Sequence, residues 1–274
     1  MSFLGKHAIV NNTVVSSSEA TINITNKSYF YSYSVYESIK VLGGKGIFLK
    51  EHLERLFFSA SGIDIRHPFT IDQIESSFYT LLKVDSIEEA TITITLVGGV
   101  ESSYFITAAN RLKYPHSFYE SGINVITYYA ERFLPRYKTN NLLVNYMGLK
   151  EASSKGAFEA LLVNKENLVL EGTRSNLFAF KDKEVFTSDE KKVLAGVTRD
   201  KVIKSIEQLG YTLKLEAPSL EKIKGNYYDG LFISSTSMGA MPIGKVDEKR
   251  CNKEIEFVKD IALLVKQLEL QELH

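Results

Sequence analysis

The chain has 274 residues, enough for one large domain or two of ordinary size, and its 44% hydrophobic and 24% charged residues are typical of a soluble globular protein. Lysine plus arginine and aspartate plus glutamate both number 33, so no charge excess indicates nucleic acid or an anionic membrane as a partner. The single cysteine, Cys251, excludes an intrachain disulfide, and no signal peptide or membrane-spanning run is recognisable, which together favour a cytoplasmic protein.

The first 112 residues mix strand and helix patterns. "HAIVNNTVV" predicts a hairpin that turns at Asn11-Asn12, because asparagine tolerates a positive φ. "VYESIKVLGGKGIFL" predicts two further strands around a glycine-rich turn. The alternating stretches "ATITITLVGG" and "YFITAA" predict another pair.

Two helices are predicted between these strands. In "KEHLERLFFSASG", Gly62 supplies a stop, and one face of the helix is apolar. That face consists of Leu53, Leu56, Phe57 and Ala60. In "TIDQIESSFYTLLKV", Thr70 and Gln73 have the spacing of a capping box.

A proline, a glycine and the absence of periodicity mark residues 113–122, "KYPHSFYESG", as a linker between domains at 1–112 and 123–274. In the second domain, strands are predicted at 123–129, 158–164, 168–172, 176–181, 211–217 and 230–234, and helices at 142–156, 198–210 and beyond 254. No regular βαβ alternation occurs, which argues against a doubly wound parallel sheet. We therefore expect an α+β fold with a smaller amino-terminal domain and a larger, strand-rich carboxyl-terminal domain.

Four polar or glycine-rich segments interrupt the hydrophobic pattern. Lys138 stands just ahead of an apolar helix, and Glu171 directly follows the apolar strand "LVL". The loop 196–198 leads straight into a helix, where unpaired N–H groups and the helix dipole favour a phosphate. "FISSTSMGAMP" adds hydroxyl donors. Taken singly, each segment is better explained by a surface side chain, a helix cap or an ordinary loop.

One chemistry would use all four segments together. Pyridoxal phosphate needs a lysine amine, an acidic partner for its pyridine nitrogen, and an arginine and a helix start for its phosphate. Arg55 in "HLERL" would face water in the ordinary case, but it can also reach a phosphate. The combination therefore indicates this cofactor, although no single signal is specific.

Four blocks, in this order, resemble the fold-type IV pyridoxal-phosphate enzymes, also called class IV aminotransferases. The blocks are "VYESIKVLGGKGIFLKEHLERLFFSASGI", "KTNNLLVNYMGLKEASSKGAFEALLVNKENLVLEGTRSNLFAF", "AGVTRDKVI" and "GLFISSTSMGAMPI". The family includes branched-chain and D-amino acid aminotransferases and aminodeoxychorismate lyases. The resemblance covers nearly the whole chain, and its second block is the most specific.

The resemblance implies a role for each matching residue. Lys138 would form the Schiff base and shuttle the substrate's α-proton, and Glu171 would pair with the pyridine nitrogen. The phosphate would be held by Arg55, the amides of Val197 and Thr198, and Thr236. Tyr29 and Ser237 would face the substrate. The family is usually homodimeric, and its substrates are an amino acid and a keto acid.

This chain departs from the family pattern at several positions. Val97 precedes Gly98 where D-amino acid aminotransferases often carry an arginine for the substrate carboxylate, and Arg136 is a candidate replacement. Leu143 stands where branched-chain members have a tyrosine. Glu37 after Tyr36 resembles the aminotransferase branch. We therefore expect an aminotransferase, with aminodeoxychorismate lyase-type elimination and a non-catalytic binding protein as alternatives.

Overall fold

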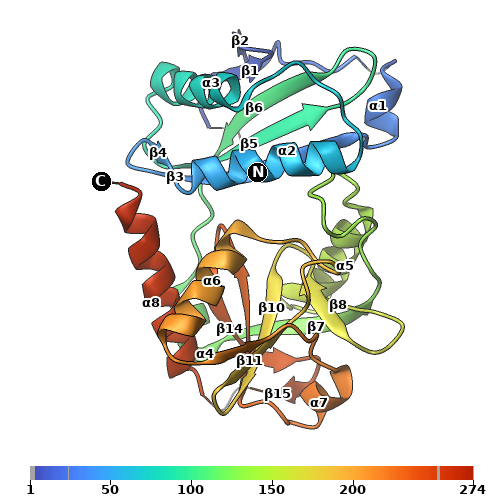
Figure 1. Cartoon of the computed structure of the whole chain (residues 1–274), viewed down its shortest axis with the longest axis vertical. Helices are drawn as coiled ribbons and strands as arrows, with labels where there is room; N and C mark the ends of the chain where they lie inside the picture. Colours follow the sequence, from blue (N-terminus) through green and yellow to red (C-terminus); the bar gives the residue numbers. More distant parts are fainter. Residues whose placement is uncertain (1–3, 24, 252–253, 274) are drawn as a thin grey trace. The chain divides into compact units, whose positions relative to one another are not determined.

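The computed structural model describes residues 4–23, 25–251 and 254–273, and its contacts divide the chain into two compact units (Figure 1). The first unit contains Met1–Leu112, Tyr137–Asn141 and Glu269–His274. The second contains Lys113–Arg136 and Leu142–Leu268. Two short segments that the sequence assigns to the second domain therefore group with the first unit.

Six strands of the first unit form an antiparallel sheet in the order β2-β1-β6-β5-β3-β4. They are β1 (His7–Val10), β2 (Thr13–Ser16), β3 (Ser34–Leu42), β4 (Lys45–Gly46), β5 (Ala90–Val97) and β6 (Ser103–Ala109). Asn11 and Asn12 have φ of 47° and 67°, as the predicted hairpin requires. The alternation along β5 is also confirmed, since every second residue from Ala90 to Leu96 is buried.

Three helices accompany this sheet: α1 (Lys27–Phe30), α2 (Leu49–Gly62) and α3 (Ile71–Val84). The predicted capping box at the start of α3 is present, with Thr70 and Gln73 each bonded to the other's backbone N–H. One face of α2 and of α3 packs into the core of this unit together with alternate residues of β3, β5 and β6. The buried stripe of α2 is Leu49, Leu53, Leu56 and Ala60.

The second unit is built on a sheet of nine strands within the described residues. They are β7 (Ile123–Tyr129), β8 (Glu159–Val163), β9 (Val169–Gly172), β10 (Asn176–Lys181), β11 (Glu184–Thr187), β12 (Thr212–Lys214), β13 (Gly230–Ser235), β14 (Gly239–Val246) and β15 (Lys249–Arg250). Because β9 pairs with both β8 and β10, six strands close into the ring β10-β13-β14-β7-β8-β9. Parallel pairs (β7–β8, β7–β14 and β11–β12) lie among antiparallel ones, so the sheet is mixed.

In the described part of this unit there are five helices: α4 (His116–Ser121), α5 (Leu143–Ser154), α6 (Val197–Gln208), α7 (Leu220–Lys224) and α8 (Glu256–Gln271), whose last turn belongs to the first unit. One apolar cluster draws residues from all six ring strands and so fills the ring. A second cluster packs α6 and α8 against the other face of β10, β13 and β14 (Figure 1).

The structure contains some elements that the sequence does not reveal. The hydroxyl-rich segment "FISSTSMGAMP" is a hairpin of β13 and β14 with a turn at 236–238, and α4 lies inside the predicted linker. The helices α1, α4 and α7 are too short to show a helical period. Among the described helices, none combines the length and apolar character needed to cross a bilayer.

Candidate active site

Helix α2 carries a polar stripe beside its apolar one. Four residues recur at intervals of three and four, so they lie along one side of the helix. They are His52, Arg55, Ser59 and Gly62. The stripe provides two contacts to β3 and two to the segment that contains Lys138.

Glu37 of β3 is fully buried and is held by the first two residues of this stripe. Arg55 donates to both carboxylate oxygens, from Nε and from a terminal nitrogen, each over 2.7 Å, and His52 Nδ1 lies 2.7 Å from Oε2. Burial raises the pKa of Glu37, but Arg55 and His52 together outweigh it and hold that pKa at about 2. Burial also lowers the pKa of His52, despite the opposing effect of Glu37, so we assign a neutral imidazole that donates to the carboxylate.

Lys138 lies in a short segment that extends the edge of β3. The backbone N–H of Tyr36 donates to the carbonyl of Lys138 over 2.9 Å, and Val35 forms an antiparallel bridge with Thr139. The Lys138 Nζ stands 4.4 Å from the centroid of the Tyr36 ring. This strand-like pairing explains why residues 137–141 belong to the first unit, whereas the sequence places Lys138 in the second domain.

A β-bulge decides which face Glu171 occupies on β9. Strands β8 and β9 pair Leu162 with Glu171 but Val163 with Val169, so Leu170 is an extra residue. In a regular strand without a bulge, Glu171 would lie two residues after Val169 and on the same face, inside the apolar cluster that fills the ring. The bulge turns the carboxylate to the opposite face.

On that face, Glu171 begins a polar row across three strands. Glu171 lies opposite Asn176 of β10, which lies opposite Ser234 of β13, and directly opposed residues share a face. Asn176 Nδ2 donates to the carbonyl of Leu194 over 2.8 Å, and the Leu194 N–H donates to Glu171 Oε2 over 3.3 Å. The backbone of Leu194 therefore ties the row to the loop that precedes α6.

Arg132 places a positive charge beside Glu171. Its terminal nitrogen lies 3.4 Å from Glu171 Oε1, and the two side chains are only 7% and 5% exposed. The sequence singles out Arg136 as the notable arginine of this segment, but Arg136 is exposed. The burial of Arg132 could not be predicted from the sequence, because this segment has no helical or strand periodicity that would distinguish a buried arginine from an exposed one.

The start of α6 is the loop for which the sequence predicts anion binding. Gly196 is its N-cap and has no side chain to cap the helix. A Cβ at this position would stand 2.4 Å from Asn176 Oδ1, so a side chain here would displace Asn176 from the polar row. Val197 and Thr198 are the first helical residues, and both are buried. Their backbone N–H groups begin the helix, where the dipole favours an anion.

The other candidate residues occupy three places. Thr236 and Ser237 lie in the turn between β13 and β14, and Ser237 Oγ is 3.1 Å from the Tyr114 hydroxyl. Tyr29 is half-buried on α1, where burial raises the pKa of its hydroxyl. Val97, at the end of β5, is 1% exposed and offers no charge. Tyr29 thus belongs to the first unit and Ser237 to the second.

The chain belongs to the class IV amino-transferase family. The sequence model of that family, described as "Amino-transferase class IV", matches residues 34–246. It is 30% identical over 265 residues to a probable branched-chain-amino-acid aminotransferase of Rickettsia felis, covering 92% of this chain and 90% of the relative. It is 31% identical over 252 residues to a D-alanine aminotransferase of Staphylococcus haemolyticus, covering 87% and 88%. The protein is therefore an aminotransferase that uses pyridoxal phosphate and acts on amino and keto acids.

Solved structures show the same fold. The branched-chain aminotransferase of the thermophilic archaeon Thermoproteus uzoniensis, with norvaline, has a TM-score of 0.88 at 21% identity, covering 98% of this chain and 96% of that one. Another branched-chain amino acid aminotransferase, solved with pyridoxamine 5'-phosphate, has a TM-score of 0.89, also at 21% identity, with coverage of 98% and 96%. The two-domain α+β fold type IV expected from the sequence is confirmed, whereas neither a lyase nor a non-catalytic protein is favoured by these relatives.

The residues of the second unit fit the cofactor. A buried carboxylate, Glu171, lies opposite Asn176, whose side chain closely approaches the helix start at Gly196. In the polar row, Ser234 Oγ is buried and has no hydrogen-bond partner among the described residues. Within the same residues, no three acidic, histidine or cysteine side chains gather in a way that would hold a metal ion.

Proposed function

We propose that Lys138 is the residue that holds pyridoxal phosphate covalently and that moves the substrate's α-proton. Bound pyridoxal phosphate withdraws electrons from the substrate's α-carbon, which makes that proton removable. The docking of residues 137–141 on β3 supports this role, because it fixes the backbone from which the amine extends. The aromatic face of Tyr36 lies beside the amine and supplies a partly apolar surrounding.

The observation that carries the proposal is the placement of Glu171. Burying a carboxylate costs free energy unless it is paired with a cation or hydrogen-bonded. Here the bulge sets the face on which Glu171 lies, Arg132 forms an ion pair with it, and the Leu194 N–H donates a hydrogen bond to it. We propose that this carboxylate pairs with the pyridine nitrogen and keeps it protonated. For the phosphate, we propose the amides of Val197 and Thr198 at the start of α6, Thr236, and Arg55.

For the substrate, we propose an amino donor with an apolar side chain, because the names of both relatives denote such amino acids. Val97 cannot bind its carboxylate, and Arg136 is exposed. We therefore propose that hydroxyl donors hold the carboxylate: Ser237, which is bonded to Tyr114, and Tyr29.

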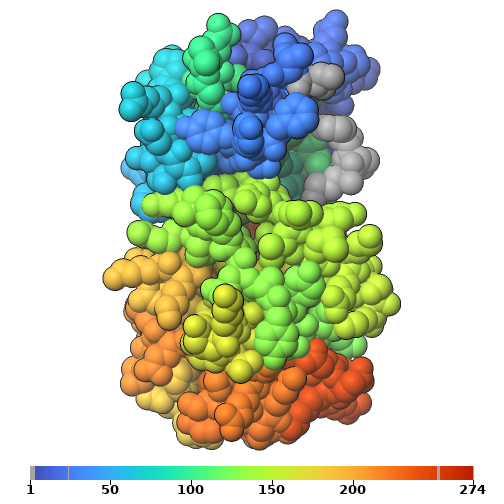
Figure 2. Space-filling model, turned by 90° about the vertical axis from the view of Figure 1, so that its right-hand side faces the viewer, coloured from blue at the N-terminus to red at the C-terminus, as the bar shows by residue number. Residues whose placement is uncertain are grey.

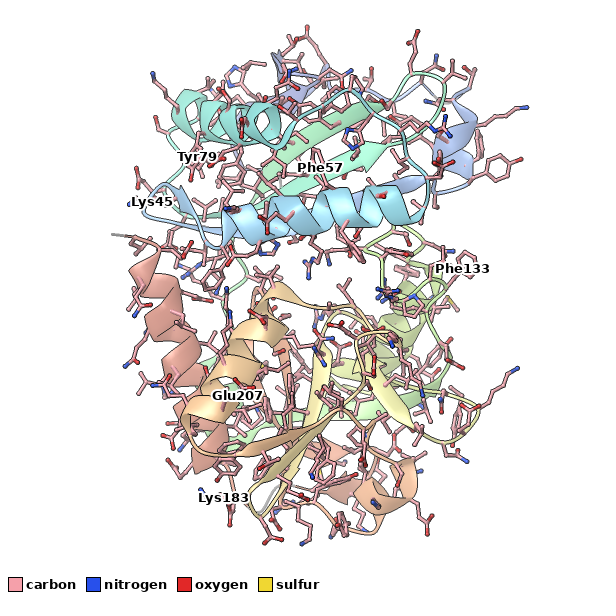
Figure 3. All side chains as sticks on the ribbon, viewed as in Figure 1. Lys45, Phe57, Tyr79, Phe133, Lys183 and Glu207 are labelled. Atoms are coloured by element: carbon pink, nitrogen blue, oxygen red, sulfur yellow. The ribbon has the colours of Figure 1, made fainter. Side chains whose placement is uncertain are left out.

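We also propose that the enzyme is a homodimer. Helix α5 exposes an apolar face, with Leu143 at 69%, Tyr146 at 64% and Met147 at 44%. The preceding segment exposes Phe133 at 67%, which Figure 3 labels. In Figure 2, the yellow-green atoms of this part of the chain lie on the face shown. Such a face is the kind that a second copy covers. Since the one cysteine is buried and unbridged, we propose a cytoplasmic enzyme.

The test is a donor screen with the holoenzyme, followed by two substitutions. We expect amino transfer to a keto acid from leucine, valine or D-alanine rather than from aspartate. Lys138→Ala should abolish turnover, and Glu171→Gln should reduce it by roughly 10²-fold or more, the scale of a lost electrostatic partner. Amino transfer within tenfold of the wild type after Lys138→Ala would refute the proposal. Lys165→Ala, on an exposed lysine of the turn between β8 and β9, is the matched control.

A further inference from the structure

Gly62 ends α2 at a place where the ring of Tyr137 occupies the space of a side chain. A Cβ at residue 62 would stand 2.0 Å from Tyr137 Cε1 and 2.3 Å from Cζ. Tyr137 directly precedes Lys138 in the sequence, and its ring also packs against Phe58 at a centroid distance of 5.4 Å. The end of α2 therefore receives the residue beside the proposed catalytic lysine.

The stop signal expected of Gly62 does not account for this glycine. Glycines that end helices do so by adopting a positive φ, but Ile63 caps this helix and the positive φ of 57° belongs to Asp64. Gly62 itself is a helical residue, and glycine is a poorer helix former than alanine. The close approach of Tyr137 therefore explains why residue 62 is a glycine.

Ser59 makes the second contact, one helical turn earlier on the same stripe. Its side chain is fully buried, and its Oγ accepts a hydrogen bond from the backbone N–H of Lys138 over 3.1 Å. The N–H of Lys138 thus bonds to α2, while its carbonyl accepts from Tyr36 of β3. Both sides of the lysine's backbone are fixed, one by a helix and one by a strand.

We propose that Ser59 and Gly62 are positioning residues for Lys138. They hold the backbone of residues 137 and 138, and so set the direction in which the amine extends. This inference rests on the proposed function of Lys138. It goes further in naming the end of α2 as the element that orients the lysine.

The experiment uses the holoenzyme and the variants Ser59→Ala and Gly62→Ala, with Ser61→Ala as a control on the exposed side of the same turn. Hydrogen–deuterium exchange of the peptide that covers residues 137–141 reports directly on docking. We expect exchange roughly tenfold faster in the two variants, since a lost acceptor or a displaced ring opens this segment. We also expect kcat to fall about tenfold or more with KM changed much less, because a misplaced amine affects the chemical step.

A double substitution separates the steric cause from general damage. If the added methyl group acts by displacing Tyr137, Gly62→Ala should have almost no further effect on exchange in a Tyr137→Ala background. The inference is overturned if Gly62→Ala and Ser59→Ala leave both exchange and kcat within about twofold of Ser61→Ala. If instead Lys138→Ala retains turnover, the proposed function fails, whatever the exchange results show.

Discussion

Arg55 holds the carboxylate of Glu37 with two hydrogen bonds of 2.7 Å, and the pair is buried between β3 and α2. A bidentate bond of this kind fixes both the distance and the plane of the two groups. His52 completes the arrangement from the preceding turn of α2. Tyr36, the neighbour of Glu37 on β3, donates a hydrogen bond to the carbonyl of Lys138. The contacts among Glu37, His52 and Arg55 therefore stabilise the strand with which the Lys138 segment pairs.

We expect Glu37→Gln to change how stability depends on pH. The folded pKa is depressed from 4.5 to about 2, so Glu37 contributes stability above about pH 4.5 and loses it as the pH falls towards 2. The shift corresponds to roughly 3 kcal/mol at neutral pH, and the variant also leaves Arg55 without its carboxylate. Urea unfolding should show a difference between variant and wild type that is about 2 kcal/mol larger at pH 7 than at pH 3. An equal difference at both values would contradict this assignment.

For Glu159, we expect the opposite dependence of stability on pH. It is fully buried at the start of β8, and burial raises its pKa, although Arg174 and hydrogen bonds from Thr173 and Ser175 oppose this. A raised folded pKa makes a contribution that is present below pH 4.5 and is lost as the pH rises through the folded pKa. Glu159→Gln removes that loss, so its stability relative to the wild type should be higher at pH 8 than at pH 4. Urea unfolding of variant and wild type at pH 4 and at pH 8 measures this, and a lower relative stability of the variant at pH 8 would refute it.

Much of the fold follows from local signals in the sequence. The hairpin at Asn11-Asn12 and the capping box at Thr70 depend on neighbouring residues only, and so could be predicted. The roles of the candidate site residues come from resemblance to a family. Those roles remain proposals, while the family itself is confirmed.

The missing parts of the site depend on pairings between distant segments. The face of Glu171 is set by one extra residue, Leu170, and alternation alone gives the wrong face. The docking of Lys138 on β3 joins residues that are far apart in the sequence, and no periodicity reports such a pairing. Gly62 resembles a simple helix stop in the sequence, because the ring that requires a glycine comes from another part of the chain.

The two arginines that precede Lys138 should differ sharply when each is replaced by methionine. Arg132 is buried beside Glu171, so Arg132→Met removes the cation that accompanies the proposed partner of the ring nitrogen. We expect kcat/KM to fall by about 10- to 100-fold. Arg136→Met is the matched control, with the same substitution on an exposed side chain, and its kinetics should barely change. A Michaelis constant raised about 10²-fold by Arg136→Met would instead make Arg136 the substrate clamp.

The last turn of α8 is joined to β3 by a buried ion pair, which gives a test of what this turn contributes. Lys40 Nζ lies 2.6 Å from Glu269 Oε1, and the two side chains are 10% and 11% exposed. Lys45 and Phe48 donate to the residues that directly follow α8, to the Leu273 carbonyl over 2.7 Å and to the Glu272 carboxylate over 3.2 Å.

Removing one partner of a buried ion pair leaves the other charge buried without compensation, whereas removing both partners leaves no buried charge. We therefore expect Lys40→Met or Glu269→Leu alone to lower the free energy of unfolding by about 3 kcal/mol, and the double variant to lower it by much less than the sum. Lys266→Met, on an exposed lysine of the preceding turn of α8, is the control. Additive losses in the double variant would mean that the two charges act independently, and that the last turn of α8 is held by its other contacts.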